Sequence, residues 1–226
     1  MLGTVQTSTA SVVSEVEIPI GHVSLEGNLV IPAGASGIVL FAHGSGSSRK
    51  SPRNQFVARM LHEAKVGTLL FDLLTLYEEF VDARTAELRF DIDLLAHRLI
   101  AATNWLRNDP RAEAMPVGYF GASTGGGAAL VAAAEPGLPV KAVVSRGGRP
   151  DLAGSALPLV TAPTLLIVGG LDYQVIEMNR VAFNQLSCEK SLQIVPGATH
   201  LFEEPGTLEE VGRLAADWFA KHFSKA

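Results

Sequence analysis

The stretch GYFGASTGGG, residues 118–127, decides how this sequence is expected to fold. The apolar run MPVGYF precedes the serine and alanines follow it, so a strand is predicted to turn into a helix at Ser123. The segment GASTG fits G-x-S-x-G, in which glycines leave room for a sharp, strained turn that lifts a serine hydroxyl above a sheet. Ser123 is therefore the candidate nucleophile, and the alternatives are a helix N-cap and a packing serine.

Runs of apolar and β-branched residues, bounded by Gly, Pro or Asp, predict eight strands: EVEIPI, VSLEGNLVIP, GIVLFAH, VGTLLFD, MPVGYFG, VKAVVSR, APTLLIVGG and SLQIVP. The first two alternate in polarity around a short turn near Gly21 and predict an antiparallel hairpin, whereas the later ones are nearly all apolar, as in buried parallel strands. Helices are expected over about 53–65, 88–107, 124–134, 174–186 and 207–223. We therefore predict an α/β fold with a mostly parallel eight-stranded sheet, an N-terminal antiparallel hairpin, helices on both faces and no large cap domain.

Length and composition narrow the class of protein. Residues 1–226 are expected to form one domain, with residues 1–14 as a flexible N-terminal segment. The net charge of −5, with scattered basic residues, gives no footprint for nucleic acid. No basic segment followed by an apolar run opens the chain, and no apolar run approaches the roughly 20 residues that span a bilayer. With Cys188 as the single cysteine, we expect a cytoplasmic protein with no disulfide, no bound metal and no membrane partner.

Residues with reactive side chains follow several predicted strands. Ligands bind outside the carboxyl ends of the strands in such a sheet, so these side chains are expected at one edge. A serine hydroxyl is a weak nucleophile and needs a base, together with a third group that orients the base. Asp172 and His200 follow Ser123 in the chain order Ser, Asp, His that is expected of this elbow. The alternatives are an N-cap role for Asp172 and a surface position for His200.

Catalysis by such a serine also needs hydrogen-bond donors for the oxyanion. The elbow supplies the backbone N–H of Thr124, and the second donor comes from the loop after the strand that ends at His43. The sequence HGSGSS lets the backbone approach closely there, so Ser45 and Gly46 are the candidate donors and His43 shapes the loop. The rival interpretation is a phosphate-cradling loop, although neither G-x-x-x-x-G-K-[ST] nor a helix-opening G-x-G-x-x-G occurs here.

Five residues are candidates for substrate contact: Arg146, Tyr77, Glu78, Glu79 and Leu201. A buried cation must be paired or meet an anionic ligand, so Arg146 either pairs with one of the two glutamates or recognises a substrate carboxylate. The insertion after Asp72, DLLTLYEEFVDARTAELRFD, either walls the pocket or is a solvated loop that enters a helix. Arg49 and Arg53 are assigned to the surface.

From about residue 22 to its end, the sequence resembles the α/β-hydrolase superfamily, and within it a bacterial group of the dienelactone hydrolase-like branch, in the segments FAHGSGSSRKSPRN, FDLLTLYEE, GYFGASTGGGAAL, VVSRGGRPDLA, GGLDYQV and PGATHLFEE. The resemblance implies hydrolysis through Ser123, Asp172 and His200, with an oxyanion hole at Ser45 and Thr124. Dienelactone hydrolase itself has a cysteine nucleophile where this chain has serine, so dienelactone is not the expected substrate. Relatives in this group also occur fused to, or beside, phosphoribosyltransferase domains.

These residues predict a cofactor-free serine carboxylesterase that cleaves small ester or lactone substrates through an acyl-enzyme on Ser123. The same residues are also compatible with acyltransferase, amidase, thioesterase or perhydrolase chemistry. A ligand receptor or regulatory partner on a hydrolase scaffold is the alternative from another class, because fold does not fix function. The expected partner is a small-molecule ester, and the expected state is a monomer or a homodimer.

Overall fold

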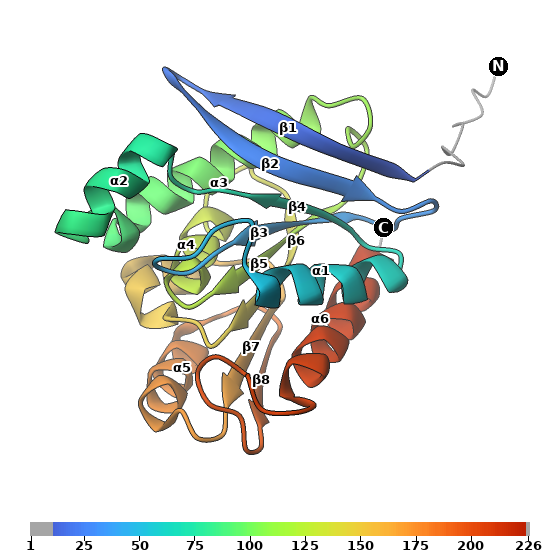
Figure 1. The fold of residues 1–226 in the computed structure, drawn as a ribbon. Helices are drawn as coiled ribbons and strands as arrows, with labels where there is room; N and C mark the ends of the chain where they lie inside the picture. The colour runs from blue at the N-terminus through green and yellow to red at the C-terminus, as the bar shows by residue number, and fades with distance from the viewer. Residues whose placement is uncertain (1–10, 225–226) are drawn as a thin grey trace.

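The computed structural model describes residues 11–224. Within these residues, eight strands form one sheet in the order β1-β2-β4-β3-β5-β6-β7-β8 (Figure 1). The strands are β1 (Val12–Ile20), β2 (Val23–Ile31), β3 (Ile38–Ala42), β4 (Gly67–Phe71), β5 (Val117–Ala122), β6 (Val140–Arg146), β7 (Thr164–Gly169) and β8 (Lys190–Val195). β1 and β2 form an antiparallel hairpin, β2 is antiparallel to β4, and the other neighbours are parallel. The predicted sheet, with its N-terminal hairpin, is confirmed.

Helices cover both faces of this sheet (Figure 1). α1 and α6 pack together on one face, and α3, α4 and α5 lie on the other. The helices are α1 (Pro52–Glu63), α2 (Leu76–Thr85), α3 (Ile92–Arg107), α4 (Thr124–Ala133), α5 (Tyr173–Gln185) and α6 (Thr207–Phe223), with 3₁₀ turns η1 (Leu88–Phe90) and η2 (Pro150–Leu159). The short segment between β6 and β7 contains only η2, so no cap domain is inserted there.

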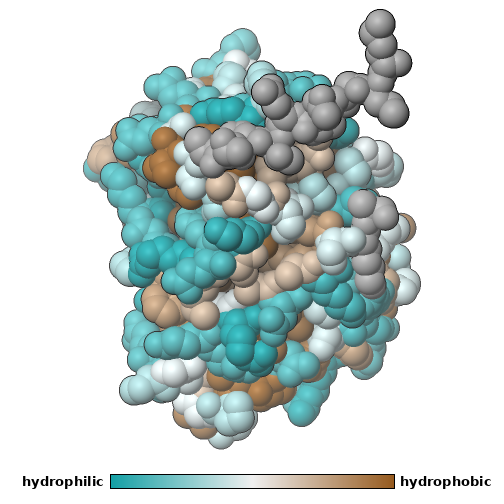
Figure 2. Space-filling model, turned by 90° about the vertical axis from the view of Figure 1, so that its right-hand side faces the viewer, coloured by the Kyte–Doolittle hydropathy of each residue, from teal (hydrophilic) through white to brown (hydrophobic). Residues whose placement is uncertain are grey.

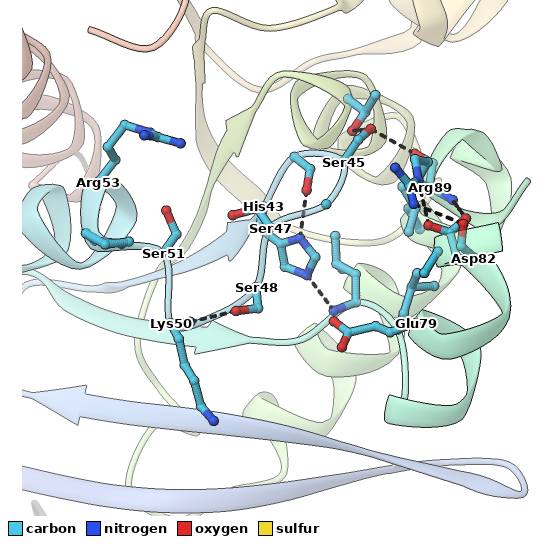
Figure 3. A pocket seen from close by; sticks show the side chains of 18 residues that line it. His43, Ser45, Ser47, Ser48, Lys50, Ser51, Arg53, Glu79, Asp82 and Arg89 are labelled. Carbon is cyan, nitrogen blue, oxygen red and sulfur yellow. Dashed lines mark hydrogen bonds and ion pairs between the residues drawn. The ribbon is translucent and has the colours of Figure 1, made fainter. Parts of the chain in front are cut away.

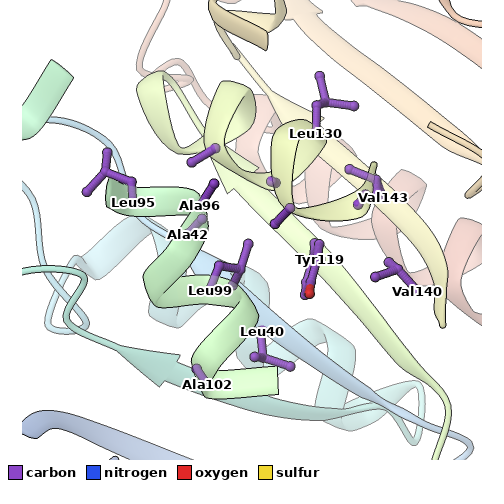
Figure 4. Close-up of a cluster of buried hydrophobic side chains, with 14 of the residues drawn as sticks. Leu40, Ala42, Leu95, Ala96, Leu99, Ala102, Tyr119, Leu130, Val140 and Val143 are labelled. Carbon is purple, nitrogen blue, oxygen red and sulfur yellow. The ribbon is translucent and has the colours of Figure 1, made fainter. Parts of the chain in front are cut away.

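Alternate residues of the central strands enter two different cores, because successive side chains of a strand point to opposite faces. In β3, Leu40 packs in the core under α3 and α4, whereas Val39 and Phe41 pack in the core under α1 and α6. Figure 4 shows Leu40 and Tyr119 of the sheet in one cluster with Leu99 of α3. Burial on both faces explains why these strands read as continuous apolar runs.

Four of the five predicted helices are present with nearly the expected bounds, as α1, α4, α5 and α6. The fifth, expected over 88–107, begins later, at Ile92. Ala86 ends the preceding helix in a left-handed conformation, with φ of 56°. Asp91 then caps α3, because its carboxylate accepts a hydrogen bond from the N–H of Leu94 (2.9 Å).

The insertion after Asp72 contains a helix, α2, that the hydrophobic pattern does not predict. Its start is fixed by a capping box. The N–H of Glu78 donates to the Thr75 hydroxyl (3.2 Å), and the N–H of Thr75 donates to the Glu78 carboxylate (2.7 Å). The pattern T-x-x-E at 75–78 is the sequence signal that marks this start.

The N-terminal segment is partly ordered as a strand. Residues 12–14 belong to β1 and pair with residues 29–31 of β2. The prediction of a flexible segment over residues 1–14 is therefore wrong for residues 12–14, whereas residues 1–10 lie outside the described residues.

Figure 2 shows the side of the molecule at which α1 and α6 end, where hydrophilic residues alternate with small hydrophobic groups. The parallel strands begin on this side, so their carboxyl ends, where a ligand is expected, face away from it (Figure 1). Within residues 11–224, none of the helices combines the length and the apolar character that a membrane crossing requires.

The packing of α6 on the sheet yields a stability prediction. Phe219 is fully buried, and a Cβ added at Gly118 of β5 would lie 2.7 Å from its Cε1 atom. We expect Phe219→Ala to lower the free energy of unfolding by about 3–5 kcal/mol, because it opens a cavity against the strand. Urea unfolding measures the change. Phe90→Ala, at a site that is 55% exposed, is the control and should cost less than about 0.5 kcal/mol; equal effects would contradict the prediction.

Candidate active site

Ser123 follows β5 directly and occupies the N-cap position of α4, but its side chain makes no capping hydrogen bond. Its backbone has φ of 51° and ψ of −123°, a conformation that residues with a Cβ rarely adopt. Such strain costs about 1–3 kcal/mol and persists only where the surroundings impose it. Ser123 therefore has the position of an N-cap, but its hydroxyl does not cap the helix and can react with a substrate.

Close backbone contacts impose this conformation. A Cβ at Gly121 would lie 2.5 Å from the carbonyl oxygen of Gly125, and a Cβ at Gly125 would overlap the carbonyl oxygen of Ala42. A Cβ at Gly44 would lie 3.0 Å from the Cβ of Ser123. The glycines of GASTG therefore allow α4 to start directly against the ends of β3 and β5, as the sequence pattern predicts.

Asp172 and His200 follow β7 and β8 and contact each other. The Nδ1 atom of His200 is 2.6 Å from Oδ2 of Asp172. Because an ionised carboxylate only accepts hydrogen bonds, Nδ1 carries the proton and Nε2 keeps its lone pair. Asp172 does occupy the N-cap position of α5, but its side chain makes no capping hydrogen bond. The carboxylate is thus committed to the imidazole rather than to the helix.

The loops after β7 and β8 are held together through their backbones. The N–H of Leu171 donates to the carbonyl oxygen of Ala198 (2.9 Å), and a Cβ at Gly169 would lie 2.5 Å from that oxygen. In the second loop, Thr199 donates from its N–H and its hydroxyl to the Glu204 carboxylate (3.0 and 2.6 Å). The sequence did not predict these hydrogen bonds. The paired glycines of VGGLD were the signal, because glycine allows a close approach of two backbones.

Ser123 and His200 flank the end of β6. The N–H of Ser123 donates to the carbonyl oxygen of Arg146, the last residue of β6 (3.3 Å). At the next residue, a Cβ on Gly147 would lie 3.6 Å from Cε1 of His200. The structure therefore brings Ser123 and the Asp172–His200 pair to the same edge of the sheet.

The candidate oxyanion donors lie on the other side of Ser123. Thr124 is the first residue of α4, so its N–H has no partner inside the helix. The Ser45 and Thr124 hydroxyl oxygens are 3.1 Å apart, which places the oxyanion loop, residues 43–48, against the start of α4. Within residues 11–224, the N–H groups of Ser45 and Gly46 make no hydrogen bond, so both are available to an oxyanion.

His43 holds the oxyanion loop in place, as the sequence predicts. Its Nε2 accepts a hydrogen bond from the N–H of Leu73 (3.0 Å), and its Nδ1 lies 3.1 Å from the carbonyl oxygen of Gly44. A neutral imidazole protonated at Nδ1 makes both bonds at once. Burial lowers the pKa of His43, which favours this neutral form.

A cavity of about 520 Å³ opens beside Thr124 (Figure 3). The segment between β3 and the start of α1 lines one side, and α2 with Arg89 lines the other. The polar lining consists of His43, Ser45, Ser47, Ser48, Lys50, Ser51, Arg53, Glu79, Asp82, Arg89 and Thr124. Asp82 and Arg89 satisfy each other through hydrogen bonds of 2.6–2.9 Å. Burial, and then the charge of Asp72, raise the pKa of the Glu79 carboxyl group, and within residues 11–224 this side chain makes no hydrogen bond.

Among the five candidate substrate residues, Glu79 lines this cavity and Glu78 does not. The Glu78 carboxylate accepts a hydrogen bond from Arg98 (2.7 Å), so a pairing of Arg146 with Glu78 is wrong. Arg146 is buried and donates instead to Oδ1 of Asn54 (3.3 Å).

Tyr77 and Leu201 lie outside the cavity. Tyr77 is 76% exposed near the start of α2, and Leu201 is 39% exposed next to His200.

Two arginines that were assigned to the surface have different positions. Arg49 is mostly buried and forms ion pairs with Asp72 and Glu26, which ties the loop after β3 to β2 and β4. Arg53, in the first turn of α1, lines the cavity. The sequence signal was the pair Ser51-Pro52, an N-cap and a first helical residue that fix where α1 starts.

The arrangement supplies groups for nucleophilic chemistry. They are a hydroxyl at the N-terminus of α4, an imidazole whose Nδ1 is bound to Asp172, and backbone N–H groups, all at one edge of the sheet. The N-terminus of a helix favours negative charge, and a developing oxyanion carries that charge. Within residues 11–224, no group of three or more His, Cys, Asp or Glu side chains could hold a metal ion.

Comparison with known proteins identifies relatives of this chain. The Dienelactone hydrolase family matches residues 75–223. The structure of a dienelactone hydrolase from Anabaena variabilis has a TM-score of 0.92 and 62% sequence identity, and the match covers 94% of this chain and 98% of that one. Est1E from Butyrivibrio proteoclasticus has a TM-score of 0.77 at 16% identity, over 93% of this chain and 99% of that one, so it shares the fold alone.

Two curated relatives come from strains of Mycobacterium tuberculosis and carry a provisional name as phosphoribosyl transferases. Each is 59% identical over 208 residues, which is 92% of this chain and 46% of the relative. The chain therefore spans about half the length of the curated relatives that it matches.

The strained turn at Ser123 yields a prediction that does not depend on activity. Glycine adopts a positive φ without strain, so we expect Ser123→Gly to be more stable than Ser123→Ala by about 1 kcal/mol. Urea unfolding of both variants measures the difference. The matched control is Ser24, an exposed residue of β2, where glycine should be less stable than alanine by about 0.5–1 kcal/mol. The same order at both positions would show that the turn is unstrained.

The buried histidines yield a pH prediction. Burial lowers the pKa of His43 and of His62, so below about pH 6.5 the unfolded chain binds protons that the folded chain excludes. This stability is present above about pH 6.5 and is lost as the pH falls, by up to about 1.4 kcal/mol per pH unit for each histidine. Urea unfolding from about pH 8 to pH 5 should show a shallower slope in His43→Gln than in the parent protein. His97→Gln, at an exposed site, should keep the parent slope; an unchanged slope in His43→Gln would contradict the prediction.

Proposed function

This chain belongs to the dienelactone hydrolase family, and we propose that it is a serine carboxylesterase that cleaves small ester or lactone substrates through an acyl-enzyme on Ser123. The observation that carries the proposal is the strained serine at the N-terminus of α4, at the same sheet edge as the hydrogen-bonded Asp172–His200 pair. Family membership supports a hydrolase, and the identity of the bond that is cleaved is part of the proposal.

In the acylation step, Oγ of Ser123 attacks the carbonyl carbon while Nε2 of His200 accepts the hydroxyl proton. Asp172 stays ionised, accepts the hydrogen bond from Nδ1 and stabilises the imidazolium that forms. The negative charge on the carbonyl oxygen is bound by the N–H of Thr124 and by an N–H of the oxyanion loop. The imidazolium then gives its proton to the leaving alkoxide as the bond between carbonyl carbon and alkoxide oxygen breaks.

In the deacylation step, water takes the place of the leaving group. Nε2 of His200 accepts a proton from this water as its oxygen attacks the acyl carbon. When the bond to Oγ of Ser123 breaks, the same proton returns to the serine, and the carboxylic acid is released. A lactone follows the same steps, except that its alkoxide remains attached to the acyl group.

The transferase name of the mycobacterial relatives belongs to proteins of about twice this length. Transfer to an acceptor other than water would use the same acyl-enzyme, so acyltransferase, amidase, thioesterase and perhydrolase activities are the closest variants of the proposal. Turnover of amide, thioester and peroxide-coupled substrates, set beside ester turnover, would separate them.

The proposal is tested with p-nitrophenyl acetate, butyrate and octanoate, using protein freed of host esterases. We expect steady turnover of the short esters by the parent protein and a loss of about three or more orders of magnitude in Ser123→Ala, because the nucleophile is removed. Asp172→Asn should lose activity with its fold intact, since the imidazole then has the wrong tautomer. Ser24→Ala, on the exposed side of the hairpin, is the control with parent activity.

Two outcomes would overturn the proposal. One is the absence of ester turnover by the parent protein, and the other is turnover that survives in Ser123→Ala. A single round of labelling at Ser123 without multiple turnover would favour a receptor on a hydrolase scaffold instead.

A further inference from the structure

β8 forms one edge of the sheet and is less buried than the other parallel strands. Within residues 11–224, β7 is its only neighbour in the sheet. Every residue of β3, β4, β5 and β7 is buried, whereas Val195 is the only buried residue of β8. An uncovered strand edge can pair with a strand of another chain, and natural proteins usually protect such edges.

The hydrogen bonds to β7 show which backbone groups of β8 point outward. The carbonyl oxygens of Glu189 and Val195 accept hydrogen bonds from N–H groups at the two ends of β7 (both 2.8 Å), and the register between them is regular. Because the backbone groups of successive residues in a strand point to opposite sides, the odd-numbered residues of β8 face β7. The residues whose N–H and C=O groups point away from the sheet are Lys190, Leu192 and Ile194.

The side chains of β8 leave this edge open. None of residues 191–194 is charged, and Gln193 donates from Nε2 to the Ser191 hydroxyl (3.1 Å) on one face. Among the strands, α6 packs mainly on β6, so it leaves Gln193 exposed. On the other face, the Lys190 ammonium turns back into its own chain and donates to two carbonyl oxygens at the C-terminal end of α5 (both 2.6 Å).

The opposite edge of the sheet, β1, is protected. Glu15 and Glu17 are exposed on β1, and Pro19 follows them. If β1 paired antiparallel with its own copy about Val16, Glu15 would lie opposite Glu17 of the second copy, and like charges destabilise such a pair. β8 is therefore the edge that accepts a second strand.

The sequence of β8 complements itself across a two-fold axis. In an antiparallel pair centred on Leu192, the outward N–H and C=O groups of this residue bond to those of the same residue in the second copy. Ser191 then lies opposite Gln193 of the second copy, in a closely spaced pair whose hydroxyl and amide can form a hydrogen bond. Lys190 lies opposite Ile194, which is 37% exposed, and the alkyl part of the lysine can cover it.

We therefore propose that β8 is a homodimer interface, at which two copies of this chain join their sheets antiparallel about a two-fold axis at Leu192. A two-fold interface uses the same patch on both copies, so the patch must complement itself. β8 meets this condition, because every side chain from Lys190 to Ile194 faces a compatible one and no like charges are opposed. The dimer goes beyond the proposed function and does not depend on it.

The first experiment measures the mass of the full chain in solution by sedimentation equilibrium. The parent protein should have the mass of two chains. Ser191→Lys combined with Gln193→Lys opposes two lysines at each of these positions, so it should give the mass of one chain. Ser191→Lys combined with Gln193→Glu opposes lysine to glutamate and should keep the mass of two chains. Glu17→Lys, at an exposed position of β1, is the matched control with the parent mass.

The second experiment tests the register. In a chain that carries Cys188→Ser, the combination of Ser191→Cys and Gln193→Cys places a thiol opposite a thiol of the second copy, with Cα atoms about 4.5 Å apart, within the range of a disulfide. Mild oxidation should give a covalent dimer on a non-reducing gel. Each single cysteine variant is the control, because its thiols lie on the diagonal, with Cα atoms about 7–8 Å apart, and should not cross-link.

Two outcomes would overturn the homodimer interface. One is a parent protein with the mass of one chain at every concentration measured. The other is a dimer that survives Ser191→Lys with Gln193→Lys, because that dimer uses another surface. The lysine and glutamate combination, together with the melting temperature of each variant, distinguishes loss of the interface from loss of the fold. Ester turnover is measured separately, so a failure of the proposed function leaves the result on mass unchanged.

Discussion

The close contact between the start of α4 and the ends of β3 and β5 is the constraint on which the candidate site depends. Without a side chain at Gly125, the first turn of α4 reaches the carbonyl oxygen of Ala42, and Ser123 is held at a positive φ. A looser junction would let Ser123 relax into an ordinary N-cap, with its hydroxyl bonded to the helix. The strain therefore keeps the hydroxyl free of the helix, and the N–H of Thr124 is free because it begins the helix.

Around this junction, some polar groups have hydrogen-bond partners within the protein and support the site, whereas others have none. Glu204 is fully engaged with Thr199, and Glu78 is engaged with Thr75 and Arg98. Such satisfied pairs fix the loop that carries the histidine and the helix that walls the cavity. Within residues 11–224, the N–H groups of Ser45, Gly46 and Thr124 have no protein partner, and a substrate would supply their hydrogen bonds.

Burial of Arg146 is a local cost to the stability of the folded state. The guanidinium group of Arg146 is buried beside Arg53 and makes a single long hydrogen bond. This burial lowers the free energy of unfolding relative to apolar side chains at the same two positions. The fold tolerates this cost because the cores on both faces of the sheet are extensive and apolar.

The sequence by itself determined the parallel sheet, the N-terminal hairpin and the strand-to-helix turn at Ser123. These features depend on local chemistry: apolar runs between Gly, Pro and Asp, and glycines that exclude side chains from a tight junction. The sequence also placed Asp172 and His200 at strand ends, because each residue directly follows an apolar run that predicts a strand. The start of α2 was equally local, in the capping box, but the hydrophobic pattern did not show it.

Only the tertiary structure decided which residues meet across the sheet. The pairing of Glu78 with Arg98, the burial of Arg146 against Asn54 and the place of Arg53 in the cavity depend on segments that are far apart in sequence. A charged residue has the same identity whether it is solvated, paired or buried alone, so its sequence context does not fix its partner. Long-range packing, which the order of the strands creates, makes that choice.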